Sequence, residues 1–243
     1  MPGAMTVVIH YPNGDALRSR SVGMVVLHGT LDLPAPPARL TAEWRRDTSA
    51  LLGPEPGDVE QLSLARTRLR WPGLRHCVRA TAEWTASMGL GTVLESADIA
   101  LMTCRGARYH HDGAQYGASA FCNLFLSDDA GLDLHFPQLD LRIALVRGTV
   151  VVFDTGQPHA VVERGRDVFD AADFPAQRDC DQVFLTWELQ IEQAQVAAAL
   201  RVAFDVDGAV VAGGVGGLDA QVRLDGVASE VCAASGRWRP MAS

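Results

Sequence analysis

The stretch ARYHHDGAQYG, Ala107 to Gly117, places two histidines and an aspartate side by side just before a glycine. Side chains on an extended segment alternate between its two faces, so His110 and Asp112 project together while His111 points away. An imidazole and a carboxylate on one face can bind the same metal ion. Because such a pair is common in proteins, a site here needs a third ligand from elsewhere in the fold.

A later segment offers that third ligand. RGTVVVFDTGQPHAVV, residues 147–162, reads as a buried strand, a turn and then His159. Two histidines and one carboxylate on one face of an octahedron form the facial triad of non-haem Fe(II) oxygenases, which leaves three positions open. The sequence therefore predicts a metal site made of His110, Asp112 and His159.

Short apolar runs separated by turn residues surround both segments. The runs are IALMTC, SAFCNLFLS, LDLHF, LRIALV, TVVVF, HAVVE and QVFLTWEL. Strands of this length and spacing are typical of a sandwich or small barrel, and not of a parallel α/β sheet. The predicted fold class is mainly β with flanking helices.

The flanking regions carry helical and turn patterns. Short strands are expected at residues 7–9 and 24–27, before the proline-rich link LPAPPARL. A helix is expected from Asp58 to Arg70, because Asp58 and Gln61 have the spacing of a capping box. A second is expected from His76 to Met88.

Two further patterns lie toward the end of the chain. The alanine-rich piece QAQVAAALRVAF, residues 193–204, is expected to be a helix, and the residues after Asp205 look strand-like. The run GGVGG near residue 213 lacks the G-x-G-x-x-G register and is expected to be a loop.

Size and composition favour one domain. The 243 residues, 48% of them hydrophobic, suffice for a full core. We predict a single domain over 1–243, with N-terminal strands and supporting helices (1–95), a core that carries the metal site (96–190) and a C-terminal extension (191–243).

Charge and cysteine content exclude several classes. The net charge of −8 argues against a nucleic-acid partner, since phosphate binding needs clustered positive charge. The sequence contains no lysine, which rules out a Schiff-base or Walker-type lysine. The five cysteines form no C-x-x-C pattern, so free buried thiols are expected. The N-terminus lacks a signal-peptide pattern and no apolar run is long enough to span a membrane, so we expect a cytoplasmic protein with no membrane partner.

Residues 99–189 resemble the core of the Fe(II)/2-oxoglutarate-dependent oxygenases, in particular the prolyl 4-hydroxylase-like branch. The resemblance rests on IALMTCRGARYHHD, SAFCNLFLSDDAGLDLHFP and RGTVVVFDTGQPHAVV, which follow one another in the family's order and at similar separations. It implies a double-stranded β-helix core of the jelly-roll, cupin-like type. It also implies that His110, Asp112 and His159 are both the metal ligands and the catalytic centre.

The same resemblance implies the reaction. Fe(II), 2-oxoglutarate and O2 would serve as cofactor and co-substrates, with ascorbate as a possible reductant. An unactivated C–H bond of a small molecule or amino acid would be hydroxylated, with release of succinate and CO2. A protein side chain stays open as the substrate, and the oligomeric state is either monomer or homodimer.

Four residues outside the triad are candidates for contact with 2-oxoglutarate. The family places a basic residue about ten positions beyond the distal histidine, but position 169 of this sequence is phenylalanine. We prefer Arg178, at the start of the strand that follows, with Arg166 second, because an arginine fork matches a carboxylate. Asn123 and Tyr116 match positions that contact the co-substrate in the family.

Alternatives to this hypothesis stay open at the level of sequence. HHDG can also be read from His111 as H-x-G, which resembles related halogenases in which glycine vacates a ligand position. We favour H-x-D because the carboxylate of Asp112 offers iron a hard anionic ligand. A non-catalytic β-helix binding protein with a relic metal site and another metal-dependent cupin-type enzyme are the remaining alternatives.

Overall fold

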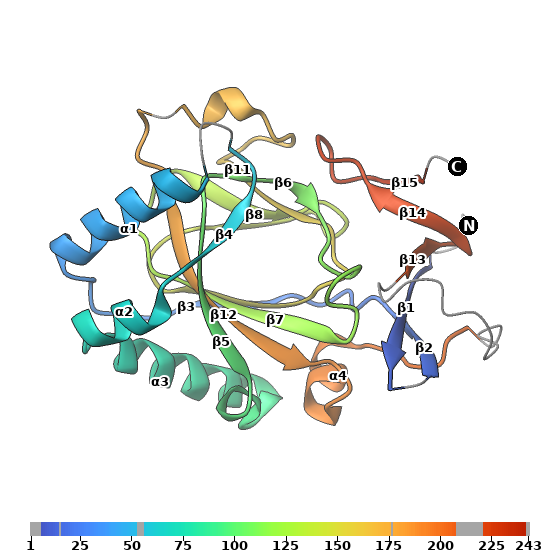
Figure 1. The fold of residues 1–243 in the computed structure, drawn as a ribbon. Coiled ribbons are helices and arrows are strands. Elements are labelled where there is room, and N and C mark those ends of the chain that lie inside the picture. Colours follow the sequence, from blue (N-terminus) through green and yellow to red (C-terminus); the bar gives the residue numbers. More distant parts are fainter. Residues whose placement is uncertain (1–5, 15, 53–55, 176, 208–220, 242–243) are drawn as a thin grey trace.

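The computed structural model describes residues 6–14, 16–52, 56–175, 177–207 and 221–241. Its strands form a six-stranded, a four-stranded and a five-stranded sheet, all with antiparallel pairing (Figure 1). The six- and four-stranded sheets make up the centre of the molecule, and the five-stranded sheet lies to one side of them.

Eight consecutive strands build the two central sheets. They are β5 (Asp98–Cys104), β6 (Ala107–His110), β7 (Ser119–Phe125), β8 (Leu132–Phe136), β9 (Leu141–Ala144), β10 (Thr149–Asp154), β11 (His159–Glu163) and β12 (Gln182–Gln190). Their order is β5-β12-β7-β10 in one sheet and β6-β11-β8-β9 in the other. This winding between two facing sheets is a double-stranded β-helix, which confirms the predicted fold class.

The other elements surround this core. β3 (Leu27–Thr30) and β4 (Val59–Leu62) extend the first sheet at its two edges. The side sheet contains β1 (Val7–Asn13), β2 (Ala16–Ser21), β13 (Gln221–Leu224), β14 (Val227–Val231) and β15 (Trp238–Pro240). The α-helices are α1 (Ala38–Leu51), α2 (Leu64–Arg70), α3 (Leu74–Thr85) and α4 (Ala194–Leu200). Helices α1 to α3 lie together on the side of the core opposite to β14 and β15 (Figure 1).

The six-stranded sheet has an apolar core on each of its faces, as the period-two pattern of its strands requires. Leu101 and Leu185 belong to the cluster that packs against the helices, together with Trp44. Phe125 and Phe184 belong to the cluster between the two central sheets. Burying a large apolar side chain stabilises the fold by about 1.5–3 kcal/mol, so both clusters contribute substantially.

The helix predicted from Asp58 to Arg70 is wrong in its first half. Val59–Leu62 forms β4, which pairs with the free edge of β5, and Leu62 lies opposite Leu101. The helix α2 starts only after Ser63, whose Oγ accepts a hydrogen bond from the backbone N–H of Arg66. Val59–Leu62, which the capping-box spacing assigned to a helix, instead pairs with the open edge of β5.

Smaller differences concern the N-terminal third. The structure adds helix α1 and strand β2, which the sequence patterns did not indicate, and the second predicted strand lies at Leu27–Thr30, where it pairs with β10. The helix predicted from His76 is confirmed as α3, which continues into a π-helical turn at Ala86–Leu90. The predicted helix at 193–204 is confirmed over α4. The expected loop near residue 213 lies outside the described residues.

The cysteines agree with their prediction in all but one respect. All five are free, and Cys77, Cys104, Cys122 and Cys180 are buried, whereas Cys232 is partly exposed. None of the helices in the described residues is both long and apolar enough to span a bilayer.

Candidate metal centre

His110, Asp112 and His159 meet where β6 pairs with β11. The antiparallel register sets His110 directly opposite His159, and Asp112 follows two residues after the end of β6. The carboxylate oxygens of Asp112 lie 3.6 Å from the Nε2 atom of each histidine. One ligand atom from each of the three residues lies within 4.8 Å of the others, so the group could hold a single metal ion.

Backbone carbonyl groups set the orientation of both imidazole rings. The Nδ1 atom of His110 lies 2.7 Å from the carbonyl oxygen of Arg108, and that of His159 lies 2.9 Å from the carbonyl oxygen of Gln157. A carbonyl oxygen only accepts, so each Nδ1 carries the proton and donates it. Both Nε2 atoms are thereby left with a free lone pair that faces Asp112.

Burial shifts the pKa values of His159 and Asp112. It lowers the pKa of His159 well below its ordinary value, and the neighbouring His110 acts in the same direction. Burial also raises the pKa of Asp112, against the opposing effect of His110. His159 is therefore held neutral, and the Asp112 carboxylate lacks sufficient compensating charge within the protein, so a bound cation would stabilise it.

The surroundings of His111 and Gly113 bear on the two registers of the HHDG stretch. The ring of His111 lies 5.1 Å from that of Trp238, and His111 is not part of the group formed by His110, Asp112 and His159. A side chain added at Gly113 would meet Ile9 at 2.9 Å and the backbone of Gly156 at 3.2 Å, so this glycine allows close packing. His111 lies outside the group of residues that could hold a metal ion, which favours the H-x-D reading over the H-x-G reading.

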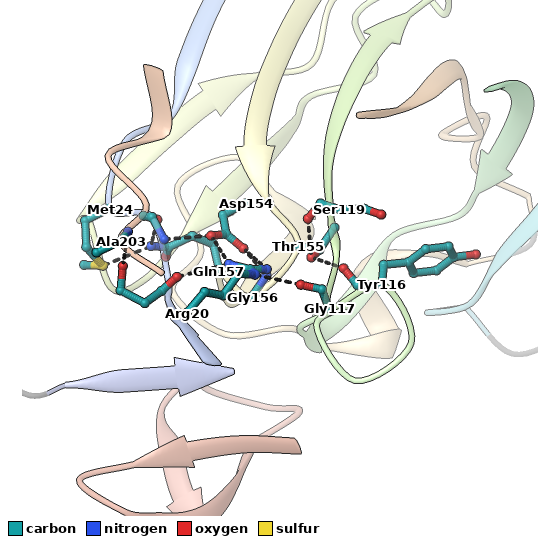
Figure 2. Close-up of polar contacts among 12 residues, drawn as sticks. Arg20, Met24, Tyr116, Gly117, Ser119, Asp154, Thr155, Gly156, Gln157 and Ala203 are labelled. Atoms are coloured by element: carbon teal, nitrogen blue, oxygen red, sulfur yellow. Dashed lines mark hydrogen bonds and ion pairs between the residues drawn. The ribbon is translucent and has the colours of Figure 1, made fainter. Parts of the chain in front are cut away.

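A fully buried ion pair supports the turn that precedes His159. Arg20 on β2 and Asp154 at the end of β10 have no exposed side-chain surface, and Nη1 and Nη2 donate to the two carboxylate oxygens at 2.6 and 3.0 Å (Figure 2). The backbone N–H groups of Gly23 and Gly156 also donate to Asp154. Asp154 thus ties the side sheet to the turn.

The same network reaches the loop that carries Asp112. Arg20 Nε donates to the carbonyl oxygen of Gly117 at 2.6 Å, and the Thr155 hydroxyl lies 2.8 Å from the carbonyl oxygen of Tyr116 (Figure 2). The backbone N–H of Asp112 donates to the carbonyl oxygen of Thr155. The two ligand-bearing segments are therefore held together by direct hydrogen bonds to Thr155 and by the buried Arg20.

A cavity of about 850 Å³ opens beside the triad, between the two central sheets. Most of its wall on the six-stranded sheet comes from every second residue of β5, β7 and β12, because alternate side chains face the same side. These residues are Asp98, Ala100, Met102, Cys104, Phe121, Asn123, Phe125, Phe184, Thr186 and Glu188. Exposure falls from Asp98 to Cys104, so the carboxylates lie at the mouth and the aromatic rings lie deeper.

The structure brings two of the four predicted co-substrate residues to this cavity. Asn123 and Tyr116 line it. Asn123 is 8% exposed, and its Oδ1 atom has no hydrogen-bond partner. Thr186, directly opposite Asn123 in the β7–β12 register, also has a buried hydroxyl oxygen without a partner.

The two predicted arginines do not line the cavity. Arg178 pairs with Glu163 and donates to the carbonyl oxygen of Ala130 at 2.7 Å. Arg166 is exposed and lies 3.4 Å from Asp173. Each guanidinium is already paired with an acidic residue outside the cavity, so the role predicted for these two arginines receives no support from their positions. The one arginine among the described lining residues is Arg108.

Sequence reasoning missed several residues of the cavity wall. Asp98, Thr186 and Glu188 lie on strands that were predicted, and their even-numbered spacing was the available signal. That signal did not show which face of the strand lines the cavity. Arg108 was missed although it lies inside the stretch that carries the triad.

Comparisons with known proteins give matches in structure only. No protein-family model matches the chain, and no curated protein sequence matches it. The structure is similar to that of a prolyl-4-hydroxylase from Pseudomonas putida, with 18% identity and a TM-score of 0.40, over 68% of this chain and 92% of that chain.

Two further solved structures are similar over the same 68% of this chain. One is the non-haem α-ketoglutarate-dependent epimerase SnoN from nogalamycin biosynthesis, with 13% identity, a TM-score of 0.35 and 78% of that chain covered. The other is EvdO2 from Micromonospora carbonacea var. aurantiaca, with 13% identity, a TM-score of 0.38 and 93% of that chain covered.

Proposed function

We propose that this protein is an Fe(II)- and 2-oxoglutarate-dependent dioxygenase that hydroxylates an unactivated C–H bond of a small molecule or amino acid. The observation that carries the proposal is the arrangement of His110, Asp112 and His159 beside a cavity of a double-stranded β-helix. The family resemblance of residues 99–189 supports the same function.

The donor set fits Fe(II). Two imidazole nitrogens with free lone pairs and one carboxylate are the ligands of a facial triad, which leaves open positions for co-substrate and oxygen. When bound, the iron supplies the oxidation chemistry that amino-acid side chains cannot perform. His110, Asp112 and His159 would hold it.

The rest of the site would position the ligands and exclude water. The rings of Phe153 and Phe136 pack 4.8 and 5.9 Å from the ring of His159 and cover its buried side. The carbonyl groups behind the two histidines keep their Nε2 atoms directed toward the metal position. Such outer contacts typically change metal affinity about 10- to 100-fold.

The cavity would hold the far carboxylate of 2-oxoglutarate through neutral donors. Asn123, Thr186 and Tyr116 line the cavity, and the buried hydroxyl of Thr186 has no partner among the described residues. The hydroxyl of Thr186 and the amide of Asn123 can each donate to a carboxylate oxygen. In this proposal they take the role that the sequence assigned to Arg178 or Arg166.

The alternatives receive less support. A relic site would have no reason to keep both histidine rings oriented by carbonyl groups, and these contacts are present. A halogenase-like site would require the His111 register, whereas the ring of His111 packs against Trp238 and its side chain is not part of the His110, Asp112 and His159 group. Another cupin-type metal enzyme would keep the triad, so product analysis separates it from a hydroxylase.

Metal binding and succinate formation test the proposal. Under anaerobic conditions the protein should bind one Mn(II) or Fe(II) per chain, measured by isothermal titration calorimetry. Asp112→Ala or His159→Ala should weaken binding by more than about 100-fold, since even outer-shell changes reach that range. His111→Ala is the matched control and should keep its affinity.

Turnover is measured with Fe(II), 2-oxoglutarate and ascorbate against a metabolite panel. Release of succinate together with a product heavier by one oxygen atom is the expected outcome. Metal affinity that is unchanged in the Asp112 variant, or succinate formation that does not require His159, would contradict the proposal.

A further inference from the structure

One part of the cavity, next to β4, is lined by apolar side chains from both central sheets. We call this part the apolar slot, and its residues are Val59, Met102, Cys104, Ala107, Val161 and Phe184. Three strand pairs bring them together, namely β4 with β5, β5 with β12, and β6 with β11. The slot therefore has one wall on the six-stranded sheet and one on the four-stranded sheet.

The polar residues that border the slot lie at its rim. Asp58, Glu60 and Gln61 are exposed to solvent, and Asp58 pairs with Arg108 at 3.4 Å. Within the slot, burial raises the pKa of Cys104 to about 12, so its thiol stays protonated and uncharged. A ligand in the slot therefore meets apolar surface and no charge.

Some of this apolar surface is open to a ligand. Val59 is 38% exposed, and Met102 is partly exposed on the same face of the sheet. Apolar surface that is gathered in a concave site marks a binding site, whereas apolar residues scattered singly over a surface do not. An apolar ligand would also supply packing contacts that the lining side chains lack.

The slot is separate from the place proposed for the far carboxylate of 2-oxoglutarate. Thr186 lies two residues further along β12 than Phe184, and Asn123 lies opposite Thr186 on β7. Two residues of a strand span roughly 6.5–7 Å. A carboxylate at Asn123 and Thr186 therefore leaves the slot free, although both places open onto the cavity that contains the triad.

We propose that the substrate carries an uncharged hydrocarbon group and that the apolar slot binds this group beside the triad. The inference rests on the proposed function, which it narrows to hydrophobic small molecules. A charged or strongly polar group in the slot would lose its hydration without gaining a partner. A cavity of about 850 Å³ has room for such a molecule as well as for the co-substrate.

A series of uncharged probes tests the inference. 1-Butanol, 1-pentanol, 1-hexanol and 1-heptanol each differ by one CH₂ group. In saturation-transfer NMR titrations of the metal-free protein, the affinity should rise about three- to fourfold with each added CH₂ group, as expected for its burial. 2-(2-Methoxyethoxy)ethanol has as many non-hydrogen atoms as 1-heptanol but a more polar chain, so it should bind at least about tenfold more weakly.

Two conservative variants locate the probe in the slot. Val59→Thr keeps the β-branched shape, and Met102→Gln keeps the length of the side chain. Each should weaken 1-heptanol binding about threefold or more, and the double variant about tenfold. Val227→Thr is the matched control and should keep its affinity, because Val227 is 54% exposed on β14 and is not among the residues that line the cavity.

Mn(II) gives a separate readout. Because the slot and the triad share one cavity, bound Mn(II) should broaden the resonances of bound 1-heptanol. Affinity that does not depend on chain length, unchanged affinity in the double variant, or bound Mn(II) without broadening would overturn the inference. Failure of Mn(II) to bind would contradict the proposed function alone, because the probe series is measured without metal.

Discussion

The charged residues on the two sides of the triad differ: one side contains a buried ion pair, and the other contains two neighbouring carboxylates. On the side of the five-stranded sheet, Arg20 and Asp154 form an ion pair with no exposed side-chain surface, and both are saturated with hydrogen bonds. On the cavity side, Asp98 and Glu188 lie opposite each other in the β5–β12 register, and neither forms an ion pair with a basic side chain of the described residues. Paired and buried charge sets geometry, whereas neighbouring like charges at an opening cost stability.

Breaking the buried pair should have the largest effect of the changes to these two sides. Arg20→Met leaves a buried carboxylate without its partner, and Asp154→Asn leaves a buried guanidinium with a weaker one. The free energy of unfolding should fall by about 3–5 kcal/mol for Arg20→Met, measured by urea denaturation. Arg45→Met is the control, because its pair with Asp179 is exposed and exposed pairs contribute about 0–1 kcal/mol.

Mn(II) affinity is a second measurement on the variants of the Arg20–Asp154 pair. Asp154 holds the turn that leads to His159, so Asp154→Asn should weaken Mn(II) binding about tenfold even where the protein is still folded. An unfolding free energy and an affinity both equal to those of the unchanged protein would remove the positioning role of this pair.

Neutralising Asp98 or Glu188 should change the free energy of unfolding less than breaking the buried pair, and in the opposite direction. Asp98→Asn or Glu188→Gln relieves a like-charge contact, so the free energy of unfolding should stay equal or rise by about 0.2–1 kcal/mol. Added salt should reduce the difference, because it screens partly exposed charges. A loss of more than about 1 kcal/mol would mean that these carboxylates serve the fold.

The prediction with the smallest effect concerns the thiol of Cys232, next to the cavity-lining Ala233. Cys232 precedes Ala233, which lines the cavity, and hydrogen bonds from Ser235 and the nearby backbone lower the pKa of the thiol to about 7. Burial raises the pKa of Cys104 to about 12. Iodoacetamide at pH 8 should therefore modify one cysteine per folded chain, as measured by mass spectrometry.

The control for this labelling is Cys232→Ser, which should take up no reagent. The rate for the unchanged protein should fall as the pH drops below about 7, since the thiolate is the reacting form. Modification of Cys104 or Cys180, which are buried, would show that the double-stranded β-helix opens under these conditions.

Local patterns were sufficient for the strands and for the ligand pair. Seven apolar runs predicted β5, β7, β8, β9, β10, β11 and β12, because each run is apolar and bounded by turn residues. His110 and Asp112 share a face because of two-residue alternation, which operates within a single strand. The strands and this ligand pair can therefore be predicted without knowing which strand pairs with which.

Features that depend on competition between elements were not predictable in this way. Val59–Leu62 is a strand only because β5 presents a free edge. Arg178 was preferred because it precedes the strand after His159, but its guanidinium pairs with Glu163 on β11. Neither partner lies close enough in the sequence for spacing to indicate the outcome.

The sequence by itself determined the mainly β class, and its H-x-D spacing with a histidine after a later strand predicted the triad. Period-two alternation acts over a few residues, so it can be followed along the chain. Only the tertiary structure decided that His159 lies opposite His110, that Asp98 lies opposite Glu188, and that Arg20 reaches Asp154. These are matters of register between strands distant in sequence, where a shift by one residue would turn each side chain to the other face.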